Sequence, residues 1–164
     1  MPPKITIDYL RHHPQFVDQL ARYSWLEWEV IYRERKQTFD HALKNYRERT
    51  NTDCLPLTLV ALHDRELVGT VSLKFNDLET RPDLDPWLGG LLVLPNWRQR
   101  GVATLLMRRA VEEARRLNVT RLFLWTSSAE GLYQKLGWQV VERSDYCGKP
   151  IVIMRVDLDP DAAV

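Results

Sequence analysis

The segment with the clearest chemical potential is a short basic loop at residues 95–104, which reads Pro-Asn-Trp-Arg-Gln-Arg-Gly-Val-Ala-Thr. It follows an apolar run and precedes a stretch of helical periodicity, so it joins a strand to the start of a helix. The first turn of a helix has unpaired backbone N–H groups and a partial positive charge. Because Gly101 and Ala103 are small and Arg98 is basic, a pyrophosphate can lie directly on those N–H groups. The loop therefore predicts a phosphate-binding turn, with an ordinary tight turn as the alternative.

The charge of this region differs from that of the whole chain. The 164 residues contain 23 Lys and Arg against 22 Asp and Glu, a net charge of +1, whereas residues 98–121 hold seven arginines and two glutamates. A nearly neutral chain does not indicate a nucleic-acid-binding protein. No Gly-Lys-Ser/Thr follows the strand, which excludes the glycine-rich loop of NTPases.

Composition excludes several other classes of protein. The hydrophobic and charged fractions, 45% and 27%, are close to the globular average, and the length suits a single domain over residues 1–164. No run approaches the roughly 18 apolar residues of a membrane helix, and residues 1–8 contain no apolar signal segment. Cys54 and Cys147 are far apart and the histidines form no ligand spacing, so no metal is expected. We expect a cytoplasmic protein with no membrane or nucleic-acid partner.

Hydrophobic periodicity predicts the elements that hold the basic loop in place. Alternation within residues 57–75 predicts a hairpin, and apolar runs predict central strands at 87–94 and 121–126. Helices are expected over 103–117 and 128–136, the second ending at Gly137, and Gly89 and Gly90 indicate a bulge or a close backbone approach. The remaining chain predicts a strand at 5–10, a helical region at 13–50, and strands at 138–142 and 151–156 around a loop at 144–150. This order predicts an α/β (α+β) fold with a mixed sheet and helices on both faces.

Two motifs together resemble the GNAT superfamily of acetyl-CoA-dependent N-acetyltransferases. The family signature after the fourth strand is Arg/Gln-x-x-Gly-x-Gly/Ala, and residues 98–103 read Arg-Gln-Arg-Gly-Val-Ala. About 30 residues further on, the family often has Leu-Tyr-x-Lys-x-Gly-Phe, and residues 132–138 read Leu-Tyr-Gln-Lys-Leu-Gly-Trp. The resemblance covers about residues 58–158 and implies a mostly antiparallel sheet of about six or seven strands.

The resemblance implies acetyl-CoA as co-substrate and a set of residues that bind it. The backbone of residues 100–104 would bind the pyrophosphate, and the edge of the fourth strand would pair with the pantetheine amides as an added strand would. A backbone N–H there would polarise the thioester carbonyl. Many relatives have Asn where this chain has Thr126, so the nearby hydroxyls would contact the pantetheine instead. The cofactor-binding residues implied are Leu91, Leu92, Val93, Arg98, Gln99, Arg100, Gly101, Val102, Ala103, Thr104 and Ser128.

Acetyl transfer to an amine requires two proton movements. The amine must lose a proton before it attacks, and the departing thiolate must gain one. Tyr133 lies at the family's position beside the thioester and fits the second task, because its phenol is protonated at neutral pH; core packing of its ring is the alternative. The usual fourth-strand Glu is missing, which leaves Glu79, Asp83, Asp85 or a water chain as the base.

Candidate acceptor-binding residues are less sharply defined. Trp25, Trp28 and Tyr32, with Glu27 and Glu29 beside them, lie where the family's helices wall the acceptor groove, and an aromatic and acidic wall suits a cationic amine. The three aromatic residues also continue the apolar stripe of the helix, so core packing is the stronger interpretation for them. Further candidates are Tyr146, and Arg81 for an acceptor carboxylate.

These patterns predict an N-acetyltransferase that moves acetyl from acetyl-CoA to an amine by direct attack in a ternary complex. Neither motif contains a cysteine, so no covalent acetyl-enzyme is indicated. The rival hypothesis is a non-catalytic acyl-CoA-binding sensor that keeps the fold and the cofactor loop. An RNA-binding domain is a third and weaker alternative, since the usual aromatic and basic strand motif is missing. The acceptor stays open, and a homodimer is as consistent with the sequence as a monomer.

Overall fold

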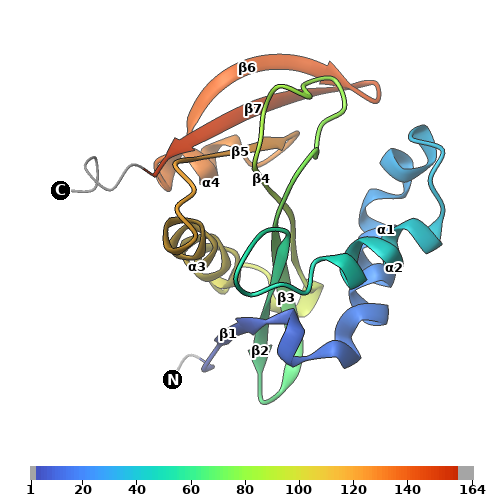
Figure 1. Cartoon of the computed structure of the whole chain (residues 1–164), viewed down its shortest axis with the longest axis vertical. Coiled ribbons are helices and arrows are strands. Elements are labelled where there is room, and N and C mark those ends of the chain that lie inside the picture. Colours follow the sequence, from blue (N-terminus) through green and yellow to red (C-terminus); the bar gives the residue numbers. More distant parts are fainter. Residues whose placement is uncertain (1–2, 159–164) are drawn as a thin grey trace.

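The computed structural model describes residues 3–158, in which seven strands form one sheet in the order β1-β2-β3-β4-β5-β7-β6 (Figure 1). The strands are β1 Thr6–Tyr9, β2 Leu57–His63, β3 Glu66–Lys74, β4 Trp87–Val93, β5 Arg121–Thr126, β6 Gln139–Tyr146 and β7 Lys149–Asp157. Neighbouring strands are antiparallel except β4 and β5, which are parallel. The mixed, mostly antiparallel sheet expected from the sequence is confirmed.

Helices cover both faces of this sheet (Figure 1). They are α1 Val17–Glu34, α2 Phe39–Glu48, α3 Val102–Arg116 and α4 Glu130–Lys135. Successive side chains of β2 point to opposite faces of the sheet. Leu59 and Ala61 pack in the core that contains Leu106 of α3. Val60 and Leu62 pack against α1 and α2 on the other face. None of the helices in residues 3–158 combines the length and apolar character needed to cross a membrane.

The sheet opens between its two parallel strands. The described chain pairs β4 with β5 only at Trp87 and Phe123, near the start of both strands. The two rings lie 5.8 Å apart in a third apolar cluster that holds this end of the sheet together. Beyond that pair, residues 88–93 have a strand neighbour only on the β3 side, so one edge of β4 has free backbone groups.

Two glycines shape β4 at this free edge. The register between β3 and β4 shifts opposite Gly90, whose φ of +62° is a conformation that glycine adopts readily. At Gly89 the Lys74 side chain lies close to the strand, since a Cβ there would lie 2.5 Å from Cε of Lys74. Of the two alternatives predicted, the bulge is confirmed.

The N-terminal boundaries differ from those predicted. The first strand ends at Tyr9, and Leu10 begins a 3-10 turn. The expected helical region at 13–50 is two helices, because the chain turns at residues 35–38, where Lys36 has a φ of +56°. Thr38 then starts α2 with a capping box in which the His41 side chain bonds the Thr38 backbone.

The C-terminal hairpin is longer than predicted. Much of the expected loop at 144–150 is strand, because β6 continues to Tyr146 and β7 begins at Lys149. Only Cys147 and Gly148 form the turn, with φ values of 49° and 76°, the pattern that two-residue hairpins favour. The helix expected over 128–136 is confined to α4, and Gly137 follows it with a φ of +93°.

Candidate functional site

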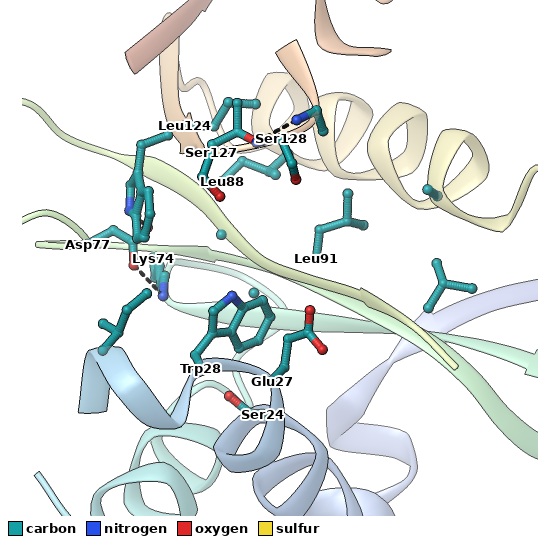
Figure 2. Close-up of a pocket in the computed structure, with 18 of the residues that line it drawn as sticks. Ser24, Glu27, Trp28, Lys74, Asp77, Leu88, Leu91, Leu124, Ser127 and Ser128 are labelled. Carbon is teal, nitrogen blue, oxygen red and sulfur yellow. Dashed lines mark hydrogen bonds and ion pairs between the residues drawn. The ribbon is translucent and has the colours of Figure 1, made fainter. Parts of the chain in front are cut away.

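A cavity of about 830 Å³ lies where β4 and β5 separate (Figure 2). Its lining includes Leu124 and Tyr133 from the core on the α3 side of the sheet, and Trp28 and Tyr46 from the layer of α1 and α2. The cavity therefore passes through the opened sheet, and two reactants can meet in it from opposite faces.

The basic turn singled out in the sequence forms one end of this cavity. Gly101, with a φ of +82°, is the cap residue immediately before α3, and the N–H groups in the first turn of a helix have no partner within it. Of the residues implied to bind the cofactor, the structure places these in the lining: Leu91, Val93, Arg98, Gln99, Gly101, Val102, Ala103, Thr104 and Ser128. Leu92 and Arg100 are outside it: Leu92 is buried, and the Arg100 guanidinium stacks on Trp97 at 5.1 Å.

Hydroxyl groups line the wall opposite the free edge of β4. Oγ1 of Thr126 accepts hydrogen bonds from the backbone N–H groups of Ser128 and Ala129, at 3.2 and 3.0 Å. Thr126 thereby holds the turn that leads into α4, and Ser127 and Ser128 contribute to the lining in the same region (Figure 2).

Tyr133 reaches the cavity from α4. Its ring packs in the core 6.5 Å from the ring of Trp138, and the residue is 8% exposed. Its hydroxyl forms no hydrogen bond with another residue in 3–158. Burial raises the pKa of the phenol, so Tyr133 carries its proton at neutral pH.

The opposite half of the cavity contains a buried ion pair that sequence analysis did not identify. Nζ of Lys74 lies 2.5 Å from Oδ1 of Asp77, and Nε1 of Trp125 donates to Oδ2 of Asp77 at 3.0 Å (Figure 2). Burial, with a smaller contribution from the charge of Arg49, lowers the pKa of Lys74 to about 8, although Asp77 opposes this. Burial acts to raise the pKa of Asp77, but the charge and hydrogen bond of Lys74 hold it below its ordinary value.

Two further polar side chains in this half are those of Tyr46, on α2, and Arg49, the residue that follows α2. Tyr46 is 1% exposed and Arg49 is half-buried; the Arg49 guanidinium lies 5.4 Å from the centre of the Tyr46 ring. The signal that points to this region is the polar side of β3, where Thr70, Ser72 and Lys74 alternate with apolar residues on a face that helices cover. A polar stripe on a covered face indicates an interior site.

The predicted acceptor residues divide into two groups. Trp28 and Tyr32 line the cavity, whereas Trp25 packs against Tyr32 and Phe39 in the core. Tyr146 lies outside the lining, and its hydroxyl accepts a hydrogen bond from Nε of Arg35 at 2.8 Å.

Arg81 and the three carboxylates considered as bases are also outside the lining, and each has a structural partner. Arg81 pairs with Asp83 and with Glu142, at 2.9 and 2.6 Å. Glu79 lies 2.6 Å from Nε of Arg35, and Asp85 accepts the backbone N–H of Asn76 at 2.8 Å. Residues 3–158 contain no group of three or more side chains arranged to hold a metal ion.

Comparisons with known proteins agree with this architecture. The model of the acetyltransferase (GNAT) family matches residues 18–138. An aminoglycoside 6'-N-acetyltransferase complexed with coenzyme A superposes with a TM-score of 0.70 at 19% identity, covering 94% of this chain and 98% of that one. The putative acetyltransferase yncA from Salmonella typhimurium, with its cofactor acetyl-CoA, gives 0.72 at 19% identity, with 97% and 96% covered.

An aminoglycoside 6'-N-acetyltransferase from Enterococcus faecium gives a TM-score of 0.71 at 19% identity, with 94% of this chain and 98% of that one covered. At these identities the likeness shows a shared fold. No curated protein matches the sequence significantly. The family model spans well over half of the residues, and on that evidence the chain belongs to the GNAT acetyltransferase family.

Proposed function

We propose that the protein is an acetyl-CoA-dependent N-acetyltransferase that transfers acetyl to an amine by direct attack in a ternary complex. The observation that carries this proposal is the cavity through the opened sheet, which has an anion-binding turn on one side and a charged pocket on the other. A thioester and an amine entering from opposite faces would meet at the free edge of β4.

The cofactor side fits acetyl-CoA through groups of this chain. The free N–H groups at the start of α3 and the Arg98 side chain suit a pyrophosphate, and Gly101 keeps the approach open, since nothing lies within 4 Å of a Cβ built there. The unpaired edge of β4 suits the two amides of pantetheine, and a backbone N–H near the Gly90 bulge suits the thioester oxygen.

Two side chains fit the proton movements of the reaction. Glu27 lines the cavity, has no ion pair within residues 3–158, and lies below Leu91 of β4 in Figure 2, so we assign it the proton of the acceptor ammonium, taken directly or through water. The amine nitrogen then bonds to the carbonyl carbon, the nitrogen loses its second proton to solvent, the carbon–sulfur bond breaks, and Tyr133 donates its proton to the thiolate. Solvent returns the proton to Tyr133.

Two measurements test the proposal in sequence. Thermal unfolding is followed with acetyl-CoA, with CoA, and with ATP as the control phosphate; a ligand at about 100 times its dissociation constant adds about 2.7 kcal/mol of stability. Stabilisation by both CoA species and not by ATP is expected. Release of free CoA thiol is then measured with a panel of amines. Stabilisation without thiol release from any amine would favour the acyl-CoA sensor, and no stabilisation would remove both hypotheses.

A further inference from the structure

The half of the cavity that contains the Lys74–Asp77 pair, here called the acceptor half, has positive charges that are not all paired. Arg35, Arg49 and Lys74 line it, and Asp77 is the carboxylate buried among them. Lys74 is paired with Asp77, and Arg35 with Glu79 outside the lining. Arg49 forms no ion pair or side-chain hydrogen bond within residues 3–158, so the N–H donors of its guanidinium are available to an anion.

The Tyr46 hydroxyl is a second donor without a partner. Among residues 3–158, its oxygen is the buried side-chain polar atom that has no hydrogen bond. Leaving such a group buried without a partner is unfavourable, and a hydrogen bond to a ligand oxygen would remove that cost. The residue lines the cavity, and a Cβ on Gly90 would lie 3.8 Å from the hydroxyl, so the group faces the β4 bulge. Burial raises the pKa of Tyr46, which keeps the donor protonated.

Lys74 brings an ammonium to the same place. Because Gly89 has no side chain, Nζ of Lys74 lies against β4, 3.2 Å from where a Gly89 Cβ would be. The charge of Arg49 acts on both Lys74 and Asp77. Three hydrogen-bond donors therefore converge beside the β4 bulge: the Tyr46 hydroxyl on α2, the Arg49 guanidinium just after α2, and the Lys74 ammonium on β3.

Another part of the lining, on α1, has the reverse character. Glu27 and Trp28 extend from α1 toward β4 in Figure 2, and no cation within residues 3–158 pairs with Glu27. A carboxylate beside an indole suits an ammonium through charge attraction and contact with the ring face.

We propose that the acceptor is a zwitterion of the amino-acid type, a primary amine that carries a carboxylate on the same small molecule. The carboxylate binds at Tyr46, Arg49 and Lys74, and the ammonium binds at Glu27 and Trp28. This assignment rests on the proposed function and specifies its substrate class. A polycation such as an aminoglycoside is disfavoured, because it would place ammonium groups beside Arg49 and Lys74, where the buried carboxylate of Asp77 is already paired with Lys74.

The test compares acceptors that differ only in the carboxylate. Thiol release from acetyl-CoA is measured at pH 7.5 with the common L-amino acids, with their methyl esters, and with an aminoglycoside. The best amino acid is expected to exceed its own ester at least tenfold in kcat/KM, with the aminoglycoside inactive. Equal or faster turnover of the esters, or turnover of the aminoglycoside alone, would overturn the zwitterion assignment and leave the acetyltransferase proposal intact.

Variants test whether the preference for a carboxylate comes from Tyr46, Arg49 and Lys74. Arg49→Gln is expected to raise KM for the amino acid about 10- to 100-fold and to leave KM for the ester within threefold. Tyr46→Phe should raise KM for the amino acid several-fold. Arg47→Gln is the matched control: it removes the same charge from an exposed position on α2, two residues before Arg49, and should change KM less than twofold. Equal effects of Arg47→Gln and Arg49→Gln would contradict the proposal.

A binding measurement separates the two proposals if no amine turns over. Calorimetric titration of N-acetyl amino acids into the CoA-saturated protein reports the carboxylate site without chemistry. Binding that Arg49→Gln weakens at least tenfold would support the anion site even where the acetyltransferase proposal fails. Binding that this variant leaves unchanged, or no binding at millimolar concentration, would reject the site.

Discussion

The two halves of the cavity are built from different parts of the chain. The cofactor half is built from backbone: the free N–H groups at the start of α3, the glycine that precedes it, and the unpaired edge of β4. The acceptor half is built from side chains, with Glu27, Tyr46, Arg49, Lys74 and Asp77 drawn from α1, α2, β3 and the loop that follows β3. In the proposed function, the first half would bind the groups that every acyl-CoA shares, and the second would determine which amine is accepted.

The halves also differ in what a substitution does to them. A backbone site tolerates changes in most side chains and fails only where a turn or a close approach is lost. A side-chain cluster depends on each of its charged groups, so a substitution disturbs binding, and at the buried Lys74–Asp77 pair it disturbs stability as well. The substitutions below test this contrast.

The largest effect is expected where the two halves meet, at Tyr133. Tyr133→Phe removes the proposed proton donor and should lower kcat about 10²- to 10⁴-fold. The hydroxyl has no hydrogen bond within residues 3–158 and the ring remains in the core, so the midpoint of thermal unfolding and the stabilisation by CoA should change little. Steady-state kinetics and melts on the same preparation check this. Unchanged kcat would move the proton donor elsewhere, and a large loss of stability would make Tyr133 a packing residue.

A second substitution, in the acceptor half, is expected to lower the free energy of unfolding. Lys74→Met removes the ion-pair partner of the buried Asp77 carboxylate and leaves it the Trp125 N–H and the more distant charges of Arg35 and Arg49; breaking such a pair costs about 3–5 kcal/mol. Urea unfolding at pH 7 measures the cost. Lys44→Met is the control, because Lys44 is exposed and its 3.8 Å pair with Glu48 is worth about 0.5 kcal/mol at most.

The loss of stability in Lys74→Met should depend on pH in a definite direction. In the wild type Lys74 holds the pKa of Asp77 below its ordinary value, so this stabilisation is present above pH 4 and is lost as pH falls further. Without the ammonium, burial raises the pKa of Asp77, and protonation relieves the unpaired charge at low pH. The stability difference between wild type and Lys74→Met should therefore be largest near pH 7 and shrink toward pH 4. A constant difference would exclude Asp77 as its cause.

The same contrast explains how much the sequence could predict. The mixed sheet, the long α3 helix, the bulge in β4 and the lining residues from Arg98 to Thr104 follow from contiguous signals, because a strand, a turn and a helix start are local in the chain. The acceptor half has no such signal. Lys74 meets Asp77 through a short loop, but Tyr46 and Arg49 reach them only through the packing of α2 on the sheet.

The aromatic side chains of α1 show what helical periodicity alone does not predict. Helical periodicity places Trp25, Trp28 and Tyr32 on one stripe, and the stripe alone does not separate core from cavity. Trp28 has a φ of −119° inside α1, a local break in the helix, and lines the cavity, whereas Trp25 packs inside. Tyr32 also lines the cavity from a regular turn of α1, so the packing of α1 on its neighbours separates these residues, and periodicity does not report that packing.

A smaller effect is expected within the cofactor half. Arg98 lines the cavity and its Nε donates to the carbonyl of Val93 at 3.1 Å, whereas Arg100 stacks on Trp97 outside the lining. Arg98→Gln should weaken acetyl-CoA binding about 10- to 100-fold, the range of a hydrogen bond to a charged group, and Arg100→Gln less than threefold. Titration at two salt concentrations checks both variants. Equal losses would mean that net charge, not position, governs binding.

The smallest effect is a pH dependence confined to the acceptor half. Burial lowers the pKa of Lys74 to about 8, so its ammonium is present below that pH and is lost above it. Arg35 and Arg49 keep their charges, and Tyr46 stays protonated because burial raises its pKa, so carboxylate binding should weaken at high pH without vanishing.

An N-acetyl amino acid is the probe for this effect, because its carboxylate stays ionised and it has no amine to titrate. Its inhibition constant against the acceptor should rise about 3- to 10-fold between pH 6.5 and 9.5, the size expected for one partly solvated charge, with a midpoint near 8. Lys74→Arg keeps a cation that does not titrate in this range, so its profile should be flat. A midpoint that persists in Lys74→Arg would assign the titration to another group and weaken the anion site, whereas CoA binding, which depends on the other half, should be level across the same range in both proteins.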